Sequence, residues 1–424
     1  MARSLDVYLH NEMCGHLLQD KDGKLHFKYA ESWLERLKPL ALSHSLPLRK
    51  EGFGGKECHG FFGGILPEEA KREIIAKNLG ISARNDFAML EQIGGECAGA
   101  VTFLPEGTPL PKREDKYRAV SESELADILR KLPRRPLLAG DDGIRLSLAG
   151  AQDKIAVRVA GTEISIPLGG APSTHILKPK IQHLEGTVYN EAFCLKLAKA
   201  IGLPAASVET RQAEELDYLL VERYDRRVVR PYPGGPEITE RLHQEDFCQA
   251  LGIISQHKYQ NEGGPSLKQC FDLIREVSSA PVLDLQNMLD SVILNYLVGN
   301  NDAHGKNFSL TYHEGTVLTG SETRLAPLYD VLSTALYPDL SRKMAMKIGG
   351  EYDADKVIPR NFERMAEETG LAKPFVKQRV MELTQTVRSK INELPTAHQG
   401  DADVAKLILA RCHGTLRQFK NDEK

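Results

Sequence analysis

Two different spacings of apolar residues divide the chain into regions. Near its start, the runs LDVYL and LHFKY alternate apolar with polar residues, which is the pattern of half-buried strands, and the letters KDG between them are typical of a turn. Beyond about residue 240 the apolar residues recur every three or four positions, as they do on one face of a helix. In LDLQNMLDSVILNYLVG this stripe comprises Leu285, Met288, Leu289, Val292, Ile293, Tyr296 and Leu297. The pattern therefore predicts strands early in the chain and helices late.

Residues 1–136 are predicted to form a small α+β subdomain that ends in a connector. SWLERL is a short predicted helix, and residues 43–66, rich in Gly and aromatic residues, are a predicted structured loop. PEEAKREIIAKNLGI predicts a helix that begins at Pro67 and ends at Gly80. NDFAMLEQIGGECAGAVTFLP predicts a helix followed by a strand. No catalytic cluster is visible in this region.

The predicted connector covers residues 105–136. It begins with PEGTPLPKREDKY, which is rich in proline and charge. Its one predicted helix is SESELADILRKLP, in which Ser121 and Glu124 have the spacing of a capping box. We expect a new domain to begin after it.

The rest of the chain is predicted to form two lobes. Residues 137–240 contain the predicted strands TEISIPL, THILKP, PAASVETRQ and DYLLVERYDR, and IRLSLAGAQDKIAVRVA predicts two more strands around a turn of small residues. One helix, NEAFCLKLAKAIG, lies among them. Residues 241–424 are predicted to be helical in HQEDFCQALG, LKQCFDLIREVS, the stripe described above and 359–420. The predicted fold class is α+β: a small N-terminal α+β subdomain, a β-rich lobe and an all-α lobe, with a ligand-binding crevice between the lobes.

Composition disfavours several functions. The 424 residues are 41% hydrophobic and 27% charged, the balance of an ordinary globular protein. With 55 basic and 58 acidic side chains the net charge is −3, so no global positive field favours direct binding to DNA. The seven cysteines include no C-x-x-C pair, which disfavours a disulfide framework and a zinc ribbon. Without a long apolar run or a signal-peptide pattern, we expect a cytoplasmic protein with no membrane partner.

The stretch SLAGAQDK, residues 147–154, is the first candidate for chemistry. The small residues Ala149, Gly150 and Ala151 would let main-chain N–H groups approach an anion. The stretch is neither a Walker A motif nor a full G-x-G-x-x-G. Taken alone, it is better explained as a plain hairpin turn.

Two further candidates lie at the ends of predicted buried strands. Lys178 ends THILKP, where its ammonium group could reach a phosphate, although an ordinary strand-end lysine is the alternative. In YLLVERYD, Glu222 and Tyr224 follow an apolar strand, at a position where the main chain could bond to an adenine edge. The alternative there is a strand that runs into a charged turn.

The densest polar stretch is VGNNDAHGKNFSL, residues 298–310. Asp302 and Asn307 have the spacing of the catalytic base and a Mg²⁺-binding asparagine in protein kinases. A carboxylate can accept a hydroxyl proton, and an amide oxygen can hold Mg²⁺ without repelling phosphate. His304 and Lys306 could contact phosphate or fix the aspartate. The alternative is a polar loop in which asparagines cap the preceding helix.

The last candidate is Asp330, which ends the apolar run of LAPLYDVLST. A kinase places a second metal-binding carboxylate at this point of the chain, but the D-F-G string is absent because Tyr329 and Val331 flank the aspartate. An N-cap is the alternative. Together the candidates stand in the order that they have in a protein kinase, which favours a two-lobed protein-kinase-like domain over five unrelated explanations.

These stretches resemble the HipA family, the serine/threonine kinase toxins of bacterial type II toxin–antitoxin modules. RLSLAGAQDKIAV, THILKP, NEAFCLKLAKAIGL, LLVERYDR, GNNDAHGKNFSL and LAPLYDVLS resemble the kinase core of the family. LDVYLHNEMCGHL, LSHSLPL, FFGGILPE and FAMLEQIGGECAGAVTFLPEG resemble its N-terminal subdomain. The resemblance covers essentially the whole chain, and it implies a non-specific serine/threonine protein kinase with ATP and Mg²⁺ as cofactors.

The resemblance also implies roles for individual residues. Asp302 corresponds to the catalytic aspartate, and Asn307 and Asp330 correspond to metal ligands. The residues that it places at ATP are Ala149, Gly150, Ala151, Gln152, Asp153, Lys154, Lys178, Glu222, Arg223, Tyr224, His304, Tyr329 and Asp330. Ser147 corresponds to the autophosphorylated serine of the family, and a phosphate there would repel the phosphates of ATP and switch the enzyme off.

Partners and a cellular role follow from the same resemblance. It implies a helix-turn-helix antitoxin, with which the toxin joins operator DNA as a co-repressor, mainly through the antitoxin. It implies growth arrest by phosphorylation of a translation-related protein, for which an aminoacyl-tRNA synthetase is expected. One alternative is a small-molecule phosphotransferase, which residues 1–136 disfavour. The other is a catalytically silent nucleotide-binding co-repressor, which the presence of Asp302, Asn307 and Asp330 disfavours.

Overall fold

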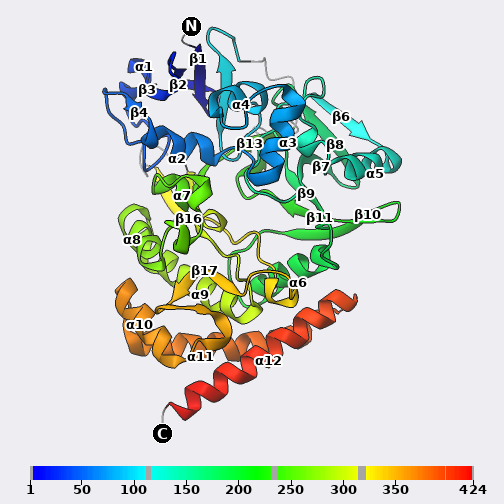
Figure 1. Cartoon of the computed structure of the whole chain (residues 1–424), viewed down its shortest axis with the longest axis vertical. Helices are drawn as coiled ribbons and strands as arrows, with labels where there is room; N and C mark the ends of the chain where they lie inside the picture. Colours follow the sequence, from blue (N-terminus) through cyan, green and yellow to red (C-terminus); the bar gives the residue numbers. More distant parts are fainter. Residues whose placement is uncertain (1–2, 111–115, 231–236, 314–320, 397, 423–424) are drawn as a thin grey trace. The chain divides into compact units, whose positions relative to one another are not determined.

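The computed structural model describes residues 3–110, 116–230, 237–313, 321–396 and 398–422, and Figure 1 shows its helices and strands. The chain divides into two compact units. Unit 1 combines Met1–Pro179, Arg211–Ser255 and Thr311–Glu322, and unit 2 combines Lys180–Thr210, Gln256–Leu310 and Thr323–Lys424. Unit 1 therefore joins the N-terminal region to most of the strands predicted for the β-rich lobe.

Unit 1 begins with a five-stranded antiparallel sheet in the order β4-β3-β2-β1-β5. Its strands are β1 (Arg3–Leu9), β2 (Glu12–Gln19), β3 (Leu25–Tyr29), β4 (Phe53–Gly54) and β5 (Val101–Pro105). The strands predicted for LDVYL and LHFKY are confirmed, and Leu5, Val7 and Leu9 of β1 are fully buried. The prediction that the KDG turn connects these two strands is wrong, because β2 forms between them and pairs with both.

The helices of unit 1 are α1 (Glu31–Leu34), α2 (Lys56–Gly64), α3 (Glu69–Leu79), α4 (Asp86–Ile93), α5 (Glu122–Lys131) and α7 (Phe247–Ala250). The capping box of Ser121 and Glu124 is confirmed at the start of α5, and left-handed Gly80 ends α3 as predicted. The loop predicted for residues 43–66 is wrong in its second half, where α2 forms. A Cβ on Gly60 would lie 2.6 Å from the main-chain carbon of Gly252, so a glycine is needed for α2 to pack this closely.

A six-stranded sheet in the order β10-β11-β9-β7-β8-β6 contains most of the other predicted strands. They are β6 (Lys116–Val120), β7 (Ile155–Ala160), β8 (Glu163–Leu168), β9 (His175–Pro179), β10 (Val208–Ala213) and β11 (Leu216–Glu222). The strand predicted just before the small-residue turn is absent, because Leu146 makes only an isolated bridge to Glu96. The predicted connector supplies the edge strand β6, and its residues 111–115 lie outside the described residues.

Three shorter strands complete this part of the chain. β12 (Arg226–Val229) and β13 (Ile238–Arg241) form a hairpin, and β14 (His243–Asp246) precedes α7. The helix predicted for HQEDFCQALG is therefore wrong in its first half. The reason is tertiary, since His243 and Glu245 on this strand are fully buried against Leu42 and Ser43.

Unit 2 is mainly helical, although the lobe predicted to be all-α also contains strands. Its helices are α6 (Thr187–Ala200), α8 (Leu267–Val277), α9 (Pro281–Val298), α10 (Pro359–Thr369), α11 (Lys373–Lys390) and α12 (Gln399–Asn421), and its strands include β17 (Lys343–Ile348) and β18 (Glu351–Asp353). Two further strands, β15 (Ser309–His313) and β16 (Glu322–Leu325), lie where the chain passes between the units. The apolar stripe of α9 is confirmed, with Met288, Leu289, Ile293 and Leu297 fully buried. None of the helices in the described part of the chain is long and apolar enough to cross a membrane.

Glu245 on β14 is a fully buried carboxyl group in unit 1. Its oxygens accept hydrogen bonds from the Ser43 and Tyr312 hydroxyls and from the His44 N–H. Burial nevertheless raises the pKa of Glu245 to about 7. The neighbouring His243 shows the opposite shift, because burial lowers its pKa to about 4.

Glu245 should make the folded state less stable as the pH rises from about 5 to 8. The pKa of Glu245 is about 7 in the folded protein, against an ordinary value of 4.5. Its contribution to the free energy of unfolding is therefore fully present below pH 4.5 and is lost above pH 7. At about 1.4 kcal/mol per pKa unit, that contribution is about 3 kcal/mol. In the variant Glu245→Gln, the new amide can donate to the Ser43 hydroxyl and accept from Tyr312 and His44. We therefore expect this variant to be about as stable as the wild type at pH 5 and more stable than the wild type at pH 8.

Urea unfolding of both proteins between pH 5 and 8 measures this difference. Below pH 6.5, the contribution of His243 to the free energy of unfolding changes with pH in the opposite direction. This contribution is present in both proteins and cancels when they are compared. A difference in unfolding free energy that stays constant with pH would show that Glu245 is ionised in the folded state.

Candidate active site

The predicted phosphate loop is held by the N-terminal part of unit 1. Ser147 is fully buried, and its hydroxyl donates to the Ile65 carbonyl at 3.0 Å while its N–H donates to the Glu96 carbonyl at 2.9 Å. Gly150 pairs with Pro67 in an isolated parallel bridge, and its carbonyl accepts from the N–H of Glu68. The hairpin that was the alternative for this stretch does not form.

Charges and backbone conformation shape the same loop. Asp153 forms an ion pair with Lys71 of α3 at 2.6 Å. Gly150 has a φ of 102°, which favours glycine, and a Cβ there would lie 2.7 Å from the Lys154 ammonium nitrogen. That ammonium group donates to the Ala149 carbonyl at 2.6 Å. The loop is therefore closed on itself by Lys154 and attached to the start of α3 by Asp153.

The strand register places Lys178 beside this loop. Lys178 lies on β9 and is 6% exposed. β7 pairs with β9 through Ile155 and Leu177, so the next position along each strand brings Lys154 opposite Lys178. Two lysines therefore lie at the point where the predicted phosphate loop enters the sheet, which is an arrangement suited to phosphate groups.

The predicted adenine-binding segment follows β11 on the other side of β9. Glu222 is the last residue of β11 and is exposed, and it pairs in register with His175. The Tyr224 hydroxyl donates to the side-chain oxygen of Gln244 at 2.8 Å. The side chain of Arg223, between them, is buried and forms ion pairs with Glu96 and Asp225.

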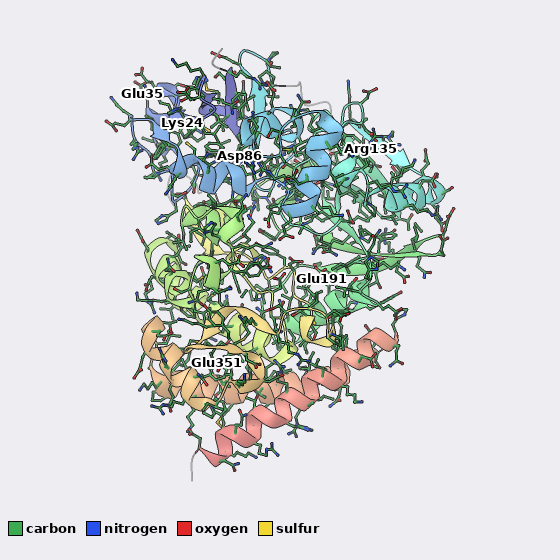
Figure 2. The ribbon with its side chains drawn as sticks, viewed as in Figure 1. Lys24, Glu35, Asp86, Arg135, Glu191 and Glu351 are labelled. Carbon is green, nitrogen blue, oxygen red and sulfur yellow. The ribbon has the colours of Figure 1, made fainter. Side chains whose placement is uncertain are left out.

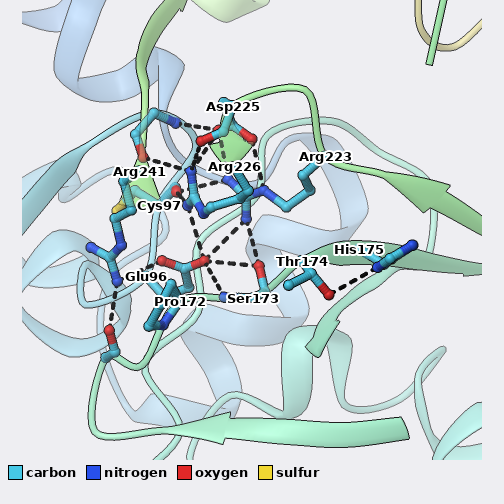
Figure 3. A network of polar contacts seen from close by, with 12 residues as sticks. Glu96, Cys97, Pro172, Ser173, Thr174, His175, Arg223, Asp225, Arg226 and Arg241 are labelled. Atoms are coloured by element: carbon cyan, nitrogen blue, oxygen red, sulfur yellow. Dashed lines mark hydrogen bonds and ion pairs between the residues drawn. The ribbon is translucent and has the colours of Figure 1, made fainter. Parts of the chain in front are cut away.

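Those groups form an ion network around Glu96, which Figure 3 shows. The Glu96 carboxylate is fully buried and pairs with the guanidinium groups of Arg223 at 3.2 Å, Arg226 at 2.9 Å and Arg241 at 2.6 Å. It also accepts from the N–H and hydroxyl of Ser173. Burial alone would raise the pKa of Glu96, but the positive charges of the three arginines have the larger combined effect and lower it to about 2.

Asp225 completes the network and fixes the backbone beyond Tyr224. It accepts two hydrogen bonds from Arg223, at 2.9 and 2.7 Å, and one from the Gly99 N–H at 2.7 Å. Despite its burial, the Arg223 and Arg226 guanidinium groups hold the pKa of Asp225 well below its usual range. Glu96 thus ties the N-terminal subdomain to the segment predicted to hold adenine. The sequence analysis missed it, although a lone Glu inside the apolar, Gly-rich IGGECAG was a usable signal.

The predicted catalytic loop lies in unit 2, directly after α9. Gly299, in the left-handed conformation, ends the helix. Asn300 and Asn301 are therefore not its caps. The Asn300 side chain accepts from the Asp302 N–H at 3.2 Å and donates to Asn295, and the Asn301 side chain donates to the Ser341 carbonyl. Both asparagines brace the loop rather than terminate the helix.

Asp302 and Asn307 are joined within this loop. The Asn307 amide nitrogen donates to the main-chain oxygen of Asp302 at 3.0 Å, which directs the nitrogen inward and leaves the amide oxygen as the atom available to a cation. The Tyr259 hydroxyl donates to one carboxylate oxygen of Asp302 at 2.8 Å. The His304 ring stands edge-on to the Tyr259 ring, with centroids 5.4 Å apart. The sequence analysis missed Tyr259 because it lies 43 residues away from Asp302.

Asp330 belongs to a segment that is attached to the catalytic loop. The hydroxyl of its neighbour Tyr329 donates to the Lys306 carbonyl at 2.7 Å and lies 2.6 Å from the Ser309 hydroxyl. Asp330 itself has a φ of 57°, a conformation that costs a non-glycine residue about 1–3 kcal/mol and is concentrated at functional sites.

The oxygen donors of this segment fit Mg²⁺. The Asp330 carboxylate and the Asn307 amide oxygen are the hard ligands that this ion prefers. Within the described ranges, no three or more His, Cys, Asp or Glu side chains form a group that could hold a metal. The proposed Mg²⁺ site would use an asparagine as one of its ligands, so it does not require a group of three His, Cys, Asp or Glu side chains.

A buried carboxylate in unit 2 was also missed by the sequence analysis. Glu191 lies on α6 and is 2% exposed, and Figure 2 labels it. α6 is the helix that follows the Lys178 strand in the chain. In protein kinases a glutamate on the equivalent helix pairs with the phosphate-binding lysine. NEAFCLKLAKAIG was recognised only as a helix, although its Glu is the one acidic residue in that segment.

Comparisons with known proteins match both parts of the chain. The family model of the HipA N-terminal domain matches residues 5–104, and that of the HipA-like C-terminal domain matches residues 146–391. The chain is 45% identical to the protein Y4mE of Sinorhizobium fredii, over 92% of this chain and 91% of that protein. It is 30% identical to the serine/threonine-protein kinase toxin HipA of Shewanella oneidensis, over 97% of this chain and 96% of that protein.

A solved structure agrees with these matches. The chain is similar to HipA in the Shewanella oneidensis complex of HipA, HipB and operator DNA, with 28% identity, 98% of both chains covered and a TM-score of 0.84. That structure has an N-terminal subdomain and a kinase-like C-terminal domain, so the predicted fold class is confirmed. The matches cover the N-terminal subdomain as well as the kinase core, and the chain therefore belongs to the HipA family of serine/threonine kinase toxins.

Proposed function

We propose that the protein is an ATP-dependent serine/threonine protein kinase that acts as the toxin of a toxin–antitoxin module. The observation that carries this proposal is the bracing of the catalytic loop. Tyr259 holds one carboxylate oxygen of Asp302, and Asn307 is tied to the main-chain oxygen of the same aspartate. A carboxylate and an amide suited to the roles of base and metal ligand are thus held in one loop, which supports a site for phosphoryl transfer.

In this proposal Asp302 orients the substrate. The Tyr259 hydroxyl holds one of its oxygens, and the carboxylate would accept the hydrogen of a serine or threonine hydroxyl. Asn307 and Asp330 would hold Mg²⁺, which supplies neutralisation of the phosphate charge when bound. His304 would lie near the phosphates, and Tyr329 would keep the Asp330 segment in place through its bond to the Lys306 carbonyl.

The ATP-binding groups proposed for unit 1 divide into two sets. The loop residues from Ala149 to Lys154, including Gln152, would surround the phosphates together with Lys178. Glu222 and Tyr224 would hold the adenine, while Arg223 would act through the ion network described above.

Ser147 is the proposed site of an autophosphorylation that switches the enzyme off. The serine is fully buried and its hydroxyl bonds to the Ile65 carbonyl, so a dianionic phosphate has no room in this conformation. Phosphorylation would therefore release the loop from the start of α3. Released, the loop no longer offers its N–H groups to ATP.

The proposed partners follow from the family. The Shewanella oneidensis structure contains HipB and operator DNA, which supports a helix-turn-helix antitoxin here and binding to DNA mainly through that partner, as a co-repressor. An aminoacyl-tRNA synthetase is the proposed substrate, and growth arrest the proposed consequence. We propose a cytoplasmic location, in keeping with seven cysteines that are all free and buried. The division at residues 136 and 240 stays a prediction.

Labelled ATP and Mg²⁺, added to the purified full-length protein with cell lysate, test the proposed function. We expect a labelled protein band in the lysate and phosphate on Ser147 of the enzyme, located by mass spectrometry. Label confined to small molecules would favour a phosphotransferase. No label in either fraction would favour a catalytically silent nucleotide-binding co-repressor.

The same reaction tests the switch at Ser147. After the phosphorylated and unphosphorylated forms are separated, we expect the phosphorylated form to bind ATP at least about tenfold more weakly, because the loop contacts are lost. Equal affinity of the two forms for ATP would contradict the off switch but would leave the kinase assignment intact.

A further inference from the structure

Unit 1 contains a cavity of about 630 Å³ that none of the predicted catalytic or ATP-binding residues lines. A cavity of this size is typical of small-molecule sites. Its walls come from the turn after β1, the segment that follows β5, the segment 169–172, and the β12–β13 hairpin. The charged residues in its lining are His10, Arg145, Arg227, Glu240, Arg241 and His313.

Arg145 gives this cavity a positive charge that has no ion-pair partner among the described residues. Its guanidinium group donates to the main-chain oxygens of Glu91 at 2.8 Å, Phe103 at 3.0 Å and Gln92 at 3.2 Å. None of the carboxylates that the structure describes forms an ion pair with it. Three carbonyl oxygens fix the position of the group but do not cancel its charge, so it favours an anion in the cavity.

The other two arginines of the lining are already paired. Arg241 is neutralised by Glu96, and Arg227 by Glu240. The lining therefore carries one net positive charge, from Arg145. A cation on a ligand would be repelled, which restricts the occupant to neutral or anionic molecules.

The rest of the lining consists largely of apolar residues and glycines. Leu104, Ala171 and Tyr312 are buried residues of the wall. Gly95 lets the chain at Arg145 pack closely against it, because a Cβ there would lie 2.8 Å from the Arg145 Cβ. A flat apolar body would fit against such surfaces and keep an acidic group near Arg145.

We propose that this cavity binds a small anionic molecule with a flat apolar body, and that Arg145 is its main charge contact. The acidic group would bond to the guanidinium N–H groups that do not face the three carbonyl oxygens. This site is separate from the proposed kinase site, and it does not depend on the protein being a kinase.

Fluorescence titration of the full-length protein with 8-anilinonaphthalene-1-sulfonate, an aromatic anion, tests the proposal. We expect the dye to bind to the folded protein and to remain bound when ATP and Mg²⁺ are added. Arg145→Gln should weaken dye binding by about tenfold or more, since it removes a partly buried charge-assisted contact. Arg230→Gln is the matched control, because Arg230 pairs with Glu237 outside the cavity and should leave the affinity unchanged.

A second variant keeps the test decisive if Arg145→Gln does not fold. Thr108 is an exposed residue of the lining, so Thr108→Glu adds a negative charge to the cavity without altering Arg145. We expect it to weaken dye binding at least about threefold relative to Thr108→Gln, by repulsion between like charges. Failure of the dye to bind, its displacement by ATP, or unchanged affinity in either Arg145→Gln or Thr108→Glu would overturn the proposal.

Discussion

Replacing Asp302 by alanine should lower the rate of phosphoryl transfer by about a thousandfold, within the range that a positioned general base contributes. The variant loses the carboxylate that Tyr259 holds, whereas Asn307 still has the main-chain oxygen of residue 302 as its partner. The loop should therefore keep its shape and the protein its affinity for ATP. Single-turnover transfer from labelled ATP, followed on Ser147 and on a protein substrate, measures the loss.

Tyr259→Phe is the matched control for this substitution. It keeps the ring that faces His304 but removes the hydroxyl that holds Asp302. We expect a smaller loss of rate, about tenfold, because a hydrogen bond to a charged group contributes about 1.5–3 kcal/mol. Undiminished autophosphorylation in Asp302→Ala would show that Asp302 is not the base. Equal losses of rate in both variants would show that the Tyr259 hydroxyl does more than orient Asp302.

Replacing Glu96 by glutamine should lower the free energy of unfolding by about 3–5 kcal/mol, the cost of removing one partner from a buried ion pair. Glu96 is fully buried and faces three guanidinium groups. The neutral glutamine would leave the buried positive charges of Arg226 and Arg241 without the negative charge that pairs with them in the wild type. Urea unfolding at neutral pH, where the wild-type carboxylate is ionised, measures the change.

Glu237→Gln provides the control for Glu96→Gln, because Glu237 pairs with Arg230 on the surface. Exposed pairs contribute about 0–1 kcal/mol, so little change in stability is expected. If the proposed adenine-binding segment is correct, Glu96→Gln should also raise the KM for ATP, because Glu96 holds Arg223 between Glu222 and Tyr224. A variant as stable as the wild type would mean that the network contributes little to folding.

Much of the proposed site could be predicted because its signals are local. Asp302 and Asn307 stand at a short spacing in a loop that directly follows an amphipathic helix, and Lys178 ends an apolar run. Each signal depends only on neighbours in the chain, so period and spacing reveal it. The glycine that ends α3 was accessible for the same reason.

The wrong predictions share a different cause. Residues 144–148 lack a strand partner because Ser147 and Leu146 pair with Ile65 and Glu96 instead. HQED forms a strand rather than a helix because His243 and Glu245 are buried against residues about 200 positions earlier. Local propensity is a weak preference, and burial of polar groups with distant partners overrides it.

By itself, the sequence determined the family, the order of the candidate motifs and the residue types that could carry phosphoryl transfer. Only the tertiary structure decided that Tyr259 holds Asp302, that Glu96 is the centre of a buried ion network, and that Arg145 lies in a cavity without a described carboxylate partner. The physical reason is that spacing along the chain encodes periodicity, whereas the pairing of distant charges depends on which surfaces pack together. A lone Glu or Tyr has no partner until the fold supplies one.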